Sequence, residues 1–280
     1  MTTRARTRTG RVLLNLAALV VIVCAVFPVY WMINTSLLPA SAVRGETPHF
    51  WPDQFTLRNY ATALGEGGFL GALGTSVTVT GITLVAALLF AFLAAVALSR
   101  FRFRSRKSIV VAILVVQMIP AEAMIISTFR VLDGWALVNT IAGLSLVYIA
   151  IVLPFTIWTL RGFVQGVPAE LEEAAMIDGC SRTGAFWRVT FPLLAPGLVA
   201  TGVFAFIQAW NEFVFALVIL TRPDPQTLPI WLRAFVQVTK ATDWSVVMAA
   251  STLMALPVVA FFLIVQHRMT GGLVSGAVKG

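Results

Sequence analysis

The sequence predicts an all-α, polytopic membrane protein with six transmembrane helices. Of its 280 residues, 59% are hydrophobic and only 11% are charged, and the mean hydropathy is +0.89. The apolar residues form continuous runs instead of alternating with a period of two, which favours a helical bundle over a β-barrel. This composition excludes an ordinary soluble domain.

Six apolar runs reach the roughly 20 residues that a helix needs to cross a bilayer. The first follows a tail, residues 1–11, and is too long for the apolar core of a cleavable signal peptide, so we expect an uncleaved helix. The last is followed by a second tail, residues 267–280. The predicted spans cover residues 12–34, 75–98, 109–128, 140–160, 197–220 and 246–266.

The distribution of Lys and Arg over alternate loops predicts the orientation of these spans. Fourteen of the 20 basic residues fall on the side that holds both termini, and six fall on the other. Both termini and the loop at 167–196 are therefore expected to be cytoplasmic. The net charge of +8 comes from residues that flank membrane spans, so it indicates lipid anchoring and topology, not nucleic-acid binding.

No catalytic or cofactor motif is recognisable in the chain. The only Lys-Ser pair lies in a basic loop without the glycine-rich turn of a phosphate cradle, and neither a Gly-x-Ser-x-Gly nor a His-Glu-x-x-His pattern occurs. Cys24 and Cys180 are placed at different membrane depths, and His49 and His267 on opposite faces, which argues against a disulfide framework or a metal site. We expect a non-enzymatic protein that binds no cofactor itself.

A polar island at residues 167–196 separates the fourth and fifth predicted spans. Pro168 suits the first position of a helix, and the acids after it favour the positive end of the helix dipole. A short helix that ends near Asp178, closed by a glycine, is expected. Ser181 is a candidate N-cap for a second short helix ending near Pro192. By itself the island would also suit an ordinary amphipathic loop helix.

The island carries Glu-Ala-Ala at 173–175, Gly179, and Val-Thr-Phe-Pro at 189–192. This pattern resembles the EAA loop of carbohydrate-type ABC importer permeases, in the subfamily similar to the maltose permease MalG. The family motif has Ile and Leu where this chain has Val189 and Phe191, and both replacements stay apolar. The resemblance implies an ATPase-coupling surface made of Glu173, Ala174, Ala175, Asp178, Gly179 and Pro192.

The resemblance extends over nearly the whole chain. One departure is the Gly-Thr-Ser sequence at 74–76, where relatives usually carry Asn-Ser, so we infer no contact from that position. Segments that resemble the family occur at 27–36, 59–60, 209–213 and 272–280.

The family resemblance implies a six-helix type I importer permease (MetI-like) fold in a bacterial plasma membrane. It also implies partners: a second, MalF-like permease, two ATPase subunits that bind the ATP and Mg²⁺, and an extracytoplasmic sugar-binding protein. The external segments at 38–74 and 222–244 are expected to meet the binding protein. The substrate is expected to be an oligosaccharide or a related polyol.

Two acids fall inside predicted spans, where a charge is costly and therefore a clue to function. Gln208, Asn211 and Glu212 share one helix face by their i, i+3, i+4 spacing. That face either lines the translocation pathway or forms interhelical hydrogen bonds, and the sequence leaves both open. Glu122 follows Pro120, a residue that kinks helices, and we favour a packing role for its carboxyl over a relay.

Two other functions remain compatible with these features. A proton-coupled secondary carrier would use Glu122 and Glu212 as its relay, although no inverted internal repeat is obvious and the coupling loop would have no purpose. A membrane-anchored scaffold or receptor subunit would use the loop for docking without any transport.

Overall fold

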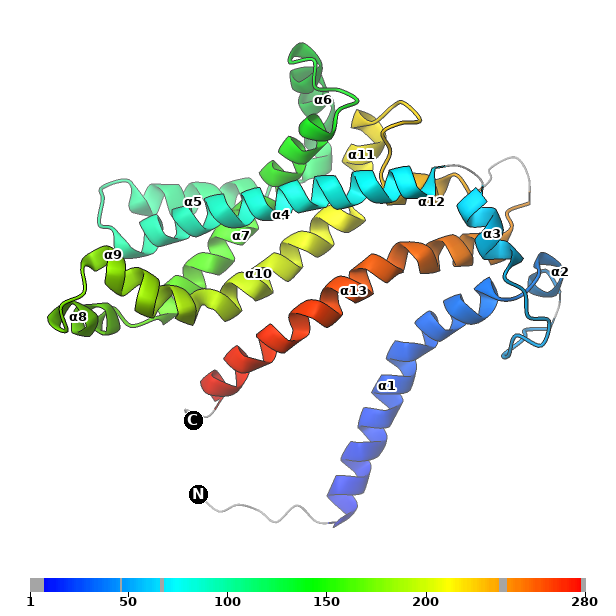
Figure 1. Cartoon of the computed structure of the whole chain (residues 1–280), viewed down its shortest axis with the longest axis horizontal. Coiled ribbons are helices and arrows are strands. Elements are labelled where there is room, and N and C mark those ends of the chain that lie inside the picture. Colours follow the sequence, from blue (N-terminus) through cyan, green and yellow to red (C-terminus); the bar gives the residue numbers. More distant parts are fainter. Residues whose placement is uncertain (1–7, 46, 66–67, 237–240, 278–280) are drawn as a thin grey trace. The chain divides into compact units, whose positions relative to one another are not determined.

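The computed structural model describes residues 8–45, 47–65, 68–236 and 241–277, and within these ranges it contains helices but no strand (Figure 1). Among the described residues, five helical segments are long and apolar enough to cross a membrane, and a bent pair of helices would make a sixth span. The long helices are α1 (Arg8–Ser36), α4 (Phe69–Arg100), α7 (Ile141–Gly166), α10 (Phe191–Asn211) and α13 (Trp244–Ala277).

Shorter helical elements connect the long ones. Those of the first half are α2 (Ala40–Val43), α3 (Arg58–Gly65), α5 (Arg106–Gln117), the 3-10 turn η1 (Ala121–Met124) and α6 (Ile125–Gly134). Those of the second half are α8 (Glu170–Ile177), α9 (Arg182–Ala185), the π-helical turn η2 (Phe186–Thr190), α11 (Val214–Ile219) and α12 (Leu228–Arg233).

The chain divides into two compact units. One comprises Met1–Gly68 and Leu232–Leu256, and the other comprises Phe69–Trp231 and Pro257–Gly280. The arginines at 4 and 6, the lysines at 240 and 279, most of the predicted N-terminal tail and the end of the C-terminal tail lie outside the described residues.

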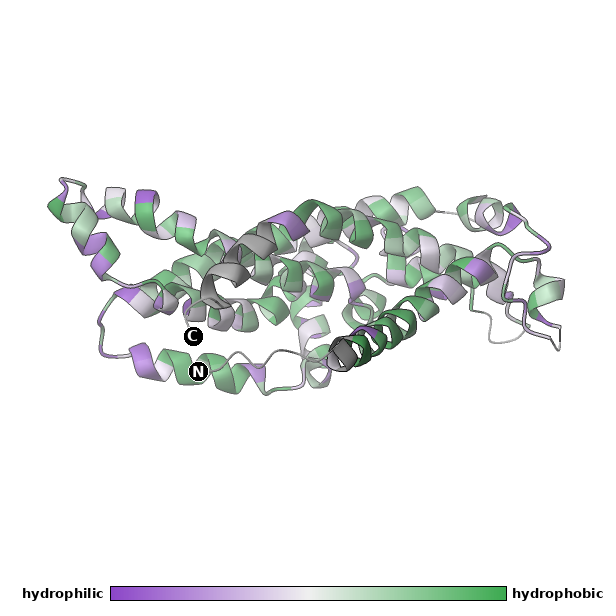
Figure 2. Ribbon diagram, turned by 90° about the horizontal axis from the view of Figure 1, so that it is seen from below, coloured by the Kyte–Doolittle hydropathy of each residue, from purple (hydrophilic) through white to green (hydrophobic). Residues whose placement is uncertain are grey.

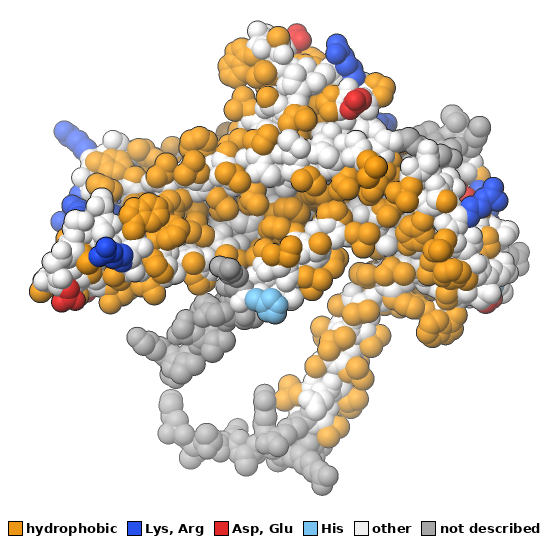
Figure 3. Space-filling view, in the orientation of Figure 1, with side chains coloured by type: hydrophobic (Ala, Val, Ile, Leu, Met, Phe, Trp, Pro, Cys, Tyr) orange, Lys and Arg blue, Asp and Glu red, His pale blue; other side chains and the backbone are white. Residues whose placement is uncertain are grey.

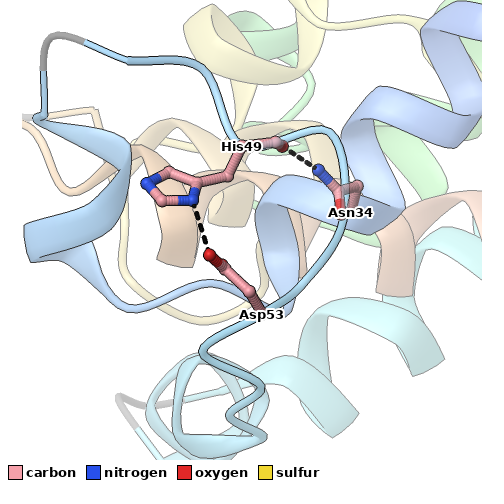
Figure 4. A network of polar contacts seen from close by, with 3 residues as sticks. All are labelled: Asn34, His49 and Asp53. Atoms are coloured by element: carbon pink, nitrogen blue, oxygen red, sulfur yellow. Dashed lines mark hydrogen bonds and ion pairs between the residues drawn. The ribbon is translucent and has the colours of Figure 1, made fainter.

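In the first unit, polar side chains hold the segment that follows α1 against the end of that helix. Buried Asn59 donates to the carbonyl of Ser36, the last residue of α1, at 2.7 Å, and to that of Leu38, just beyond the helix, at 2.8 Å. Asn34 Nδ2 donates to the carbonyl of His49 at 2.7 Å, and His49 Nδ1 lies 3.0 Å from Asp53 Oδ2 (Figure 4). These contacts join the described residues 47–60 to the end of α1, and most of these residues lie outside regular secondary structure.

In the second unit, α4 packs most extensively against α7, and α10 packs against both. The buried face of α4 includes a stripe of small side chains at intervals of three or four residues, which lets the helix backbones approach closely. Because lipid tails are as apolar as leucine, such close packing contributes more to helix association than hydrophobicity does. The stripe consists of Ala72, Ser76, Thr80, Thr83, Ala87, Ala91 and Ala95.

Hydrophobic residues cover the long helices, and hydrophilic residues concentrate in the short helices and connections (Figure 2). In the first unit, α1 exposes large apolar side chains over most of its length, from Val12 to Val29. Figure 3 shows hydrophobic side chains spread over the visible face of α4, with Lys and Arg near the end that carries α8 and α9. This chain is a multi-pass membrane protein, in which lipid would contact such surfaces.

Helices cover the first, second, fourth and sixth predicted spans, but the other two differ from the prediction. The span at 109–128 is broken: α5 and the η1–α6 segment meet at 88°, with Pro120 at the junction. The span at 197–220 is interrupted at Glu212, so α10 ends at Asn211 and α11 follows. The last helix continues to Ala277, so much of the predicted tail at 267–280 is helical.

Candidate functional site

The predicted coupling loop begins with α8, which is closed as the sequence predicts. Gly179 has a φ of +90°, a conformation that side chains disfavour. Its N–H donates to the carbonyl of Met176 at 3.1 Å, and the N–H of Cys180 donates to that of Ala175 at 3.0 Å. This pair of bonds is a Schellman motif, which satisfies carbonyls at the end of the helix and turns the chain back.

The second part of the loop begins at the predicted N-cap but continues beyond the predicted end. Ser181 Oγ accepts the N–H of Gly184 at 3.1 Å and so starts α9. The helix does not stop near Pro192: α9, η2 and α10 form one helical segment from Arg182 to Asn211. Pro192 lies in the first turn of α10, directly after the π-helical turn, where a missing N–H is tolerated.

The coupling loop presents a mixed acidic and apolar surface. Glu173, Ala174 and Asp178 are exposed, as are Gly179 and Pro192, while Ala175 is half-buried. Beside the acids, Ile177 is 87% exposed, and Met176 and Trp187 are exposed as well. A partner with an apolar cleft and a cationic rim would suit this combination.

One acid of α8 has a role that the sequence analysis missed. Glu172 Oε1 lies 3.0 Å from Arg100 Nε, at the end of α4, and accepts a hydrogen bond of 2.7 Å from Thr190 Oγ1 in η2. Arg100 Nε–H is not aligned for a hydrogen bond, so the contact with Glu172 is an ion pair, and Arg100 Nη2 donates to the carbonyl of Val167 at 3.0 Å. Nothing in the sequence near position 172 distinguishes this carboxylate from its two neighbours.

The second predicted site, at Gln208, Asn211 and Glu212, is built differently from the prediction. Glu212 is not on the face of a continuous helix: its backbone is extended, with φ −66° and ψ 128°. Its carboxylate accepts the N–H groups of Phe215, at 2.8 Å, and Ala216, at 3.0 Å, at the start of α11. The acid therefore stabilises a break in the span, because it satisfies backbone donors that the break exposes.

The three residues nevertheless lie around one cavity, of about 290 Å³. Gln208 and Asn211 line it from α10, and Glu212 lines it from the break. Tyr148 lines it from α7, and the Tyr148 hydroxyl donates to the Glu212 carbonyl at 3.2 Å. Glu122 also lines the cavity and is exposed, and its carboxylate has no hydrogen-bond partner among the described residues. The packing role favoured for this carboxyl stays a prediction. The cavity brings together polar groups from α7, α10 and η1.

Comparison with known proteins gives one family for most of the chain. Residues 87–270 match the model of the binding-protein-dependent transport system inner membrane component. The chain is 42% identical over 271 residues to the diacetylchitobiose uptake system permease protein DasC of Streptomyces coelicolor, covering 97% of this chain and 98% of DasC. It is 33% identical over 272 residues to the trehalose/maltose transport system permease protein MalG of Thermococcus litoralis, covering 96% and 97% of the two chains.

The fold also matches that of a solved structure. A chain of a bacterial ABC transporter involved in the import of the acidic polysaccharide alginate superposes with a TM-score of 0.78, over 95% of this chain and 98% of the other. The two sequences are 22% identical, so this likeness concerns the fold.

Proposed function

The chain belongs to the binding-protein-dependent transport system inner membrane components, as a carbohydrate-type permease similar to MalG, and from this premise we propose how it moves its substrate. It is a non-catalytic permease subunit of an ABC importer, so ATP is hydrolysed by separate subunits. We propose that it forms one half of a translocation pathway for a sugar and couples to the ATPases through α8 and the turn after it.

The observation that carries the coupling proposal is the exposed surface of the loop. Glu173, Ala174 and Asp178 are exposed on or directly after a short helix whose own residues are nowhere fully buried. A helix that buries so little within its own chain is suited to bind another protein. The small side chains at 174 and 175 would let it enter a cleft, with the acids meeting cations at the rim.

The proposal includes the remaining subunits of an importer. They are a second, MalF-like permease, two ATPases that hold the ATP and Mg²⁺, and an extracytoplasmic binding protein; this chain itself would hold no cofactor. Within the second unit, the connections at 101–105 and 167–181 lie at the same end of the bundle, since Arg100 contacts both Val167 and Glu172. We place this end and both chain termini in the cytoplasm, on the basis of the Lys and Arg distribution.

Transport would follow from coupling between the ATPases and the binding-protein side. Closure of the ATPases would move the loop and shift the permease pair from inward-facing to outward-facing, and the external segments at 38–74 and 222–244 would receive the binding protein. Alternating access of this kind requires that the ATPase-binding surface and the surface that receives the binding protein favour different arrangements of the same helices.

The proposed substrate is an oligosaccharide or a related polyol. DasC is named for diacetylchitobiose and the Thermococcus MalG for trehalose and maltose, which are all disaccharides. Gln208, Asn211 and Glu212 around the cavity could line the pathway of such a polar substrate, since sugar hydroxyls need both donors and acceptors.

The test is affinity purification of the tagged chain from bacterial membranes in mild detergent, with identification of co-purifying proteins and ATP-driven uptake of disaccharides after reconstitution. We expect a second permease and an ATPase with the wild-type chain, and uptake that needs both ATP and the binding protein. Purification of the chain alone, with uptake driven by a proton gradient, would replace this proposal with a secondary carrier. Docking without any uptake would indicate a scaffold.

A further inference from the structure

Three elements meet at the carboxylate of Glu172. Arg100 is the last residue of α4, Glu172 lies in the first turn of α8, and Thr190 is the last residue of η2, directly before α10. One oxygen of Glu172 contacts both partners, at 3.0 Å from Arg100 Nε and 2.7 Å from Thr190 Oγ1. The side chains of Arg100 and Glu172 are each only 15% exposed, and Thr190 is fully buried. We refer to these three residues as the Arg100–Glu172–Thr190 clamp.

Burial makes the clamp more consequential than a surface ion pair. An exposed pair contributes little because water screens it, whereas removing one partner of a largely buried pair leaves the other without compensation. The two neighbouring acids of α8, Glu170 and Glu173, are exposed, and their carboxylates make no hydrogen bond or ion pair within the described ranges. Of the three acids, Glu172 alone therefore ties α8 to the rest of the second unit.

Other contacts join the same part of the loop to α4. Phe92 of α4 lies 6.0 Å from Phe186, 6.4 Å from Trp187 and 5.7 Å from Phe191, measured between ring centroids. The rings tie η2 and the start of α10 to α4, and α8 packs against η2. The polar clamp adds an ion pair and a hydrogen bond that join α8 directly to the end of α4 and to the residue before α10.

We propose that the Arg100–Glu172–Thr190 clamp transmits displacement of α8 to α4 and α10. The inference rests on the proposed coupling of α8 to an ATPase. Arg100, Glu172 and Thr190 are positioning residues: they face the interior of the chain, while Glu173 and Asp178 face outward to the partner. Without the clamp, α8 would still dock and would keep its packing against α9 and η2, but it would lose its ion pair with α4 and its hydrogen bond to the residue before α10. Its displacement would therefore be passed less directly to these two helices.

The experiment uses the complex purified through a tag on this chain and reconstituted in lipid. Glu172→Gln removes the charge, and Thr190→Val removes the hydroxyl at nearly constant shape. Thr190→Ser keeps the hydroxyl and serves as the conservative control, and Glu170→Gln is the matched control for an exposed acid in the same turn. Three quantities are measured: ATPase recovered with the chain, sugar transported per ATP hydrolysed, and hydrogen exchange of residues 168–178.

We expect Glu172→Gln, which loses the ion pair, and Thr190→Val, which loses the hydrogen bond to the carboxylate, to retain the ATPase but to transport roughly tenfold less sugar per ATP. Exchange of residues 168–178 should rise by a similar factor in both, while Thr190→Ser and Glu170→Gln stay near wild type. Unchanged exchange, or unchanged sugar per ATP, would overturn the clamp. A wild-type complex without ATP-driven uptake would overturn the proposed function instead. This failure is distinguishable from failure of the clamp, because hydrogen exchange of residues 168–178 can be measured even if the complex transports nothing.

Discussion

Glu212 accepts the backbone N–H of Phe215 at 2.8 Å, and this bond defines the acid within the fifth span as the cap of α11. A second bond, from the N–H of Ala216 to the other carboxylate oxygen, completes the cap at 3.0 Å. An acid inside a membrane span is expensive, and here two backbone donors, exposed by the break in the helix, compensate for part of its cost. Glu212 also lines the cavity, so the same side chain can serve both this cap and the proposed pathway.

The effect of losing the capping hydrogen bonds can be distinguished from the effect of losing a carboxylate by comparing two acids that line the same cavity. Glu212→Ala should lower the free energy of unfolding of the detergent-purified chain by about 1–2 kcal/mol, because two backbone donors lose their acceptor. Glu122→Ala is the control, since Glu122 lines the same cavity and its carboxylate makes no hydrogen bond among the described residues. Thermal unfolding followed by tryptophan fluorescence measures both, and equal losses would contradict the capping role.

Reversal of the exposed charge of Glu173 on α8 should disrupt docking of the ATPase. Glu173→Lys is expected to abolish uptake and ATPase recovery while leaving membrane insertion intact, because the side chain is exposed and makes no hydrogen bond or ion pair with the described part of the chain. Asp133→Lys is the control, as it reverses an exposed acid of α6 outside the loop. Normal uptake by Glu173→Lys would refute the coupling assignment.

The turn after α8 should tolerate no side chain. Gly179→Asp is expected to abolish uptake and ATPase recovery, because a residue with a Cβ is strained at a φ of +90° and the helix end would rearrange. Gly162→Ala, in α7, is the control, since a Cβ there meets nothing within 4 Å. Both variants should insert in membranes to wild-type levels on immunoblots. Retained ATPase recovery by Gly179→Asp would show that the turn geometry is unimportant.

Asn139 should matter both for its backbone conformation and for its side chain. It has a φ of 61°, and its Oδ1 accepts the N–H groups of Thr221, at 2.7 Å, and Arg222, at 3.0 Å. Asn139→Gly keeps the backbone conformation and should cost about 1 kcal/mol for the lost bonds. Asn139→Ala should cost about 1 kcal/mol more for its left-handed backbone. Equal stability of the two variants in thermal unfolding would argue against a backbone contribution.

The contact between α7 and α10 at Gly197 leaves no room for a methyl group. A Cβ at Gly197 would overlap the ring of Phe163, approaching its Cδ1 to 2.7 Å. Gly197→Ala should therefore lower stability by about 1–3 kcal/mol, the usual cost of overpacking. Gly162→Ala again provides the control. If the double variant Gly197→Ala, Phe163→Ala is as unstable as Gly197→Ala alone, the ring is not the obstacle.

Several features of this protein follow from short stretches of sequence. The helical class follows from continuous apolar runs, the end of α8 from Gly179, and the start of α9 from Ser181, because each depends on interactions within a few residues. The bend at Pro120 is likewise local. The EAA pattern predicted the family, which the comparisons confirm.

The tertiary structure decided what depends on distant partners. Pro192 predicted a helix end, but the preceding π-helical turn accommodates it and the helix continues. The predicted helix face at Glu212 is a break, because the carboxylate binds the N–H groups of the next helix. Glu172 resembles Glu170 and Glu173 in sequence, and only the approach of Arg100 and Thr190 distinguishes it. A sequence specifies which groups need partners, whereas packing of the helices determines which groups come close enough to provide them.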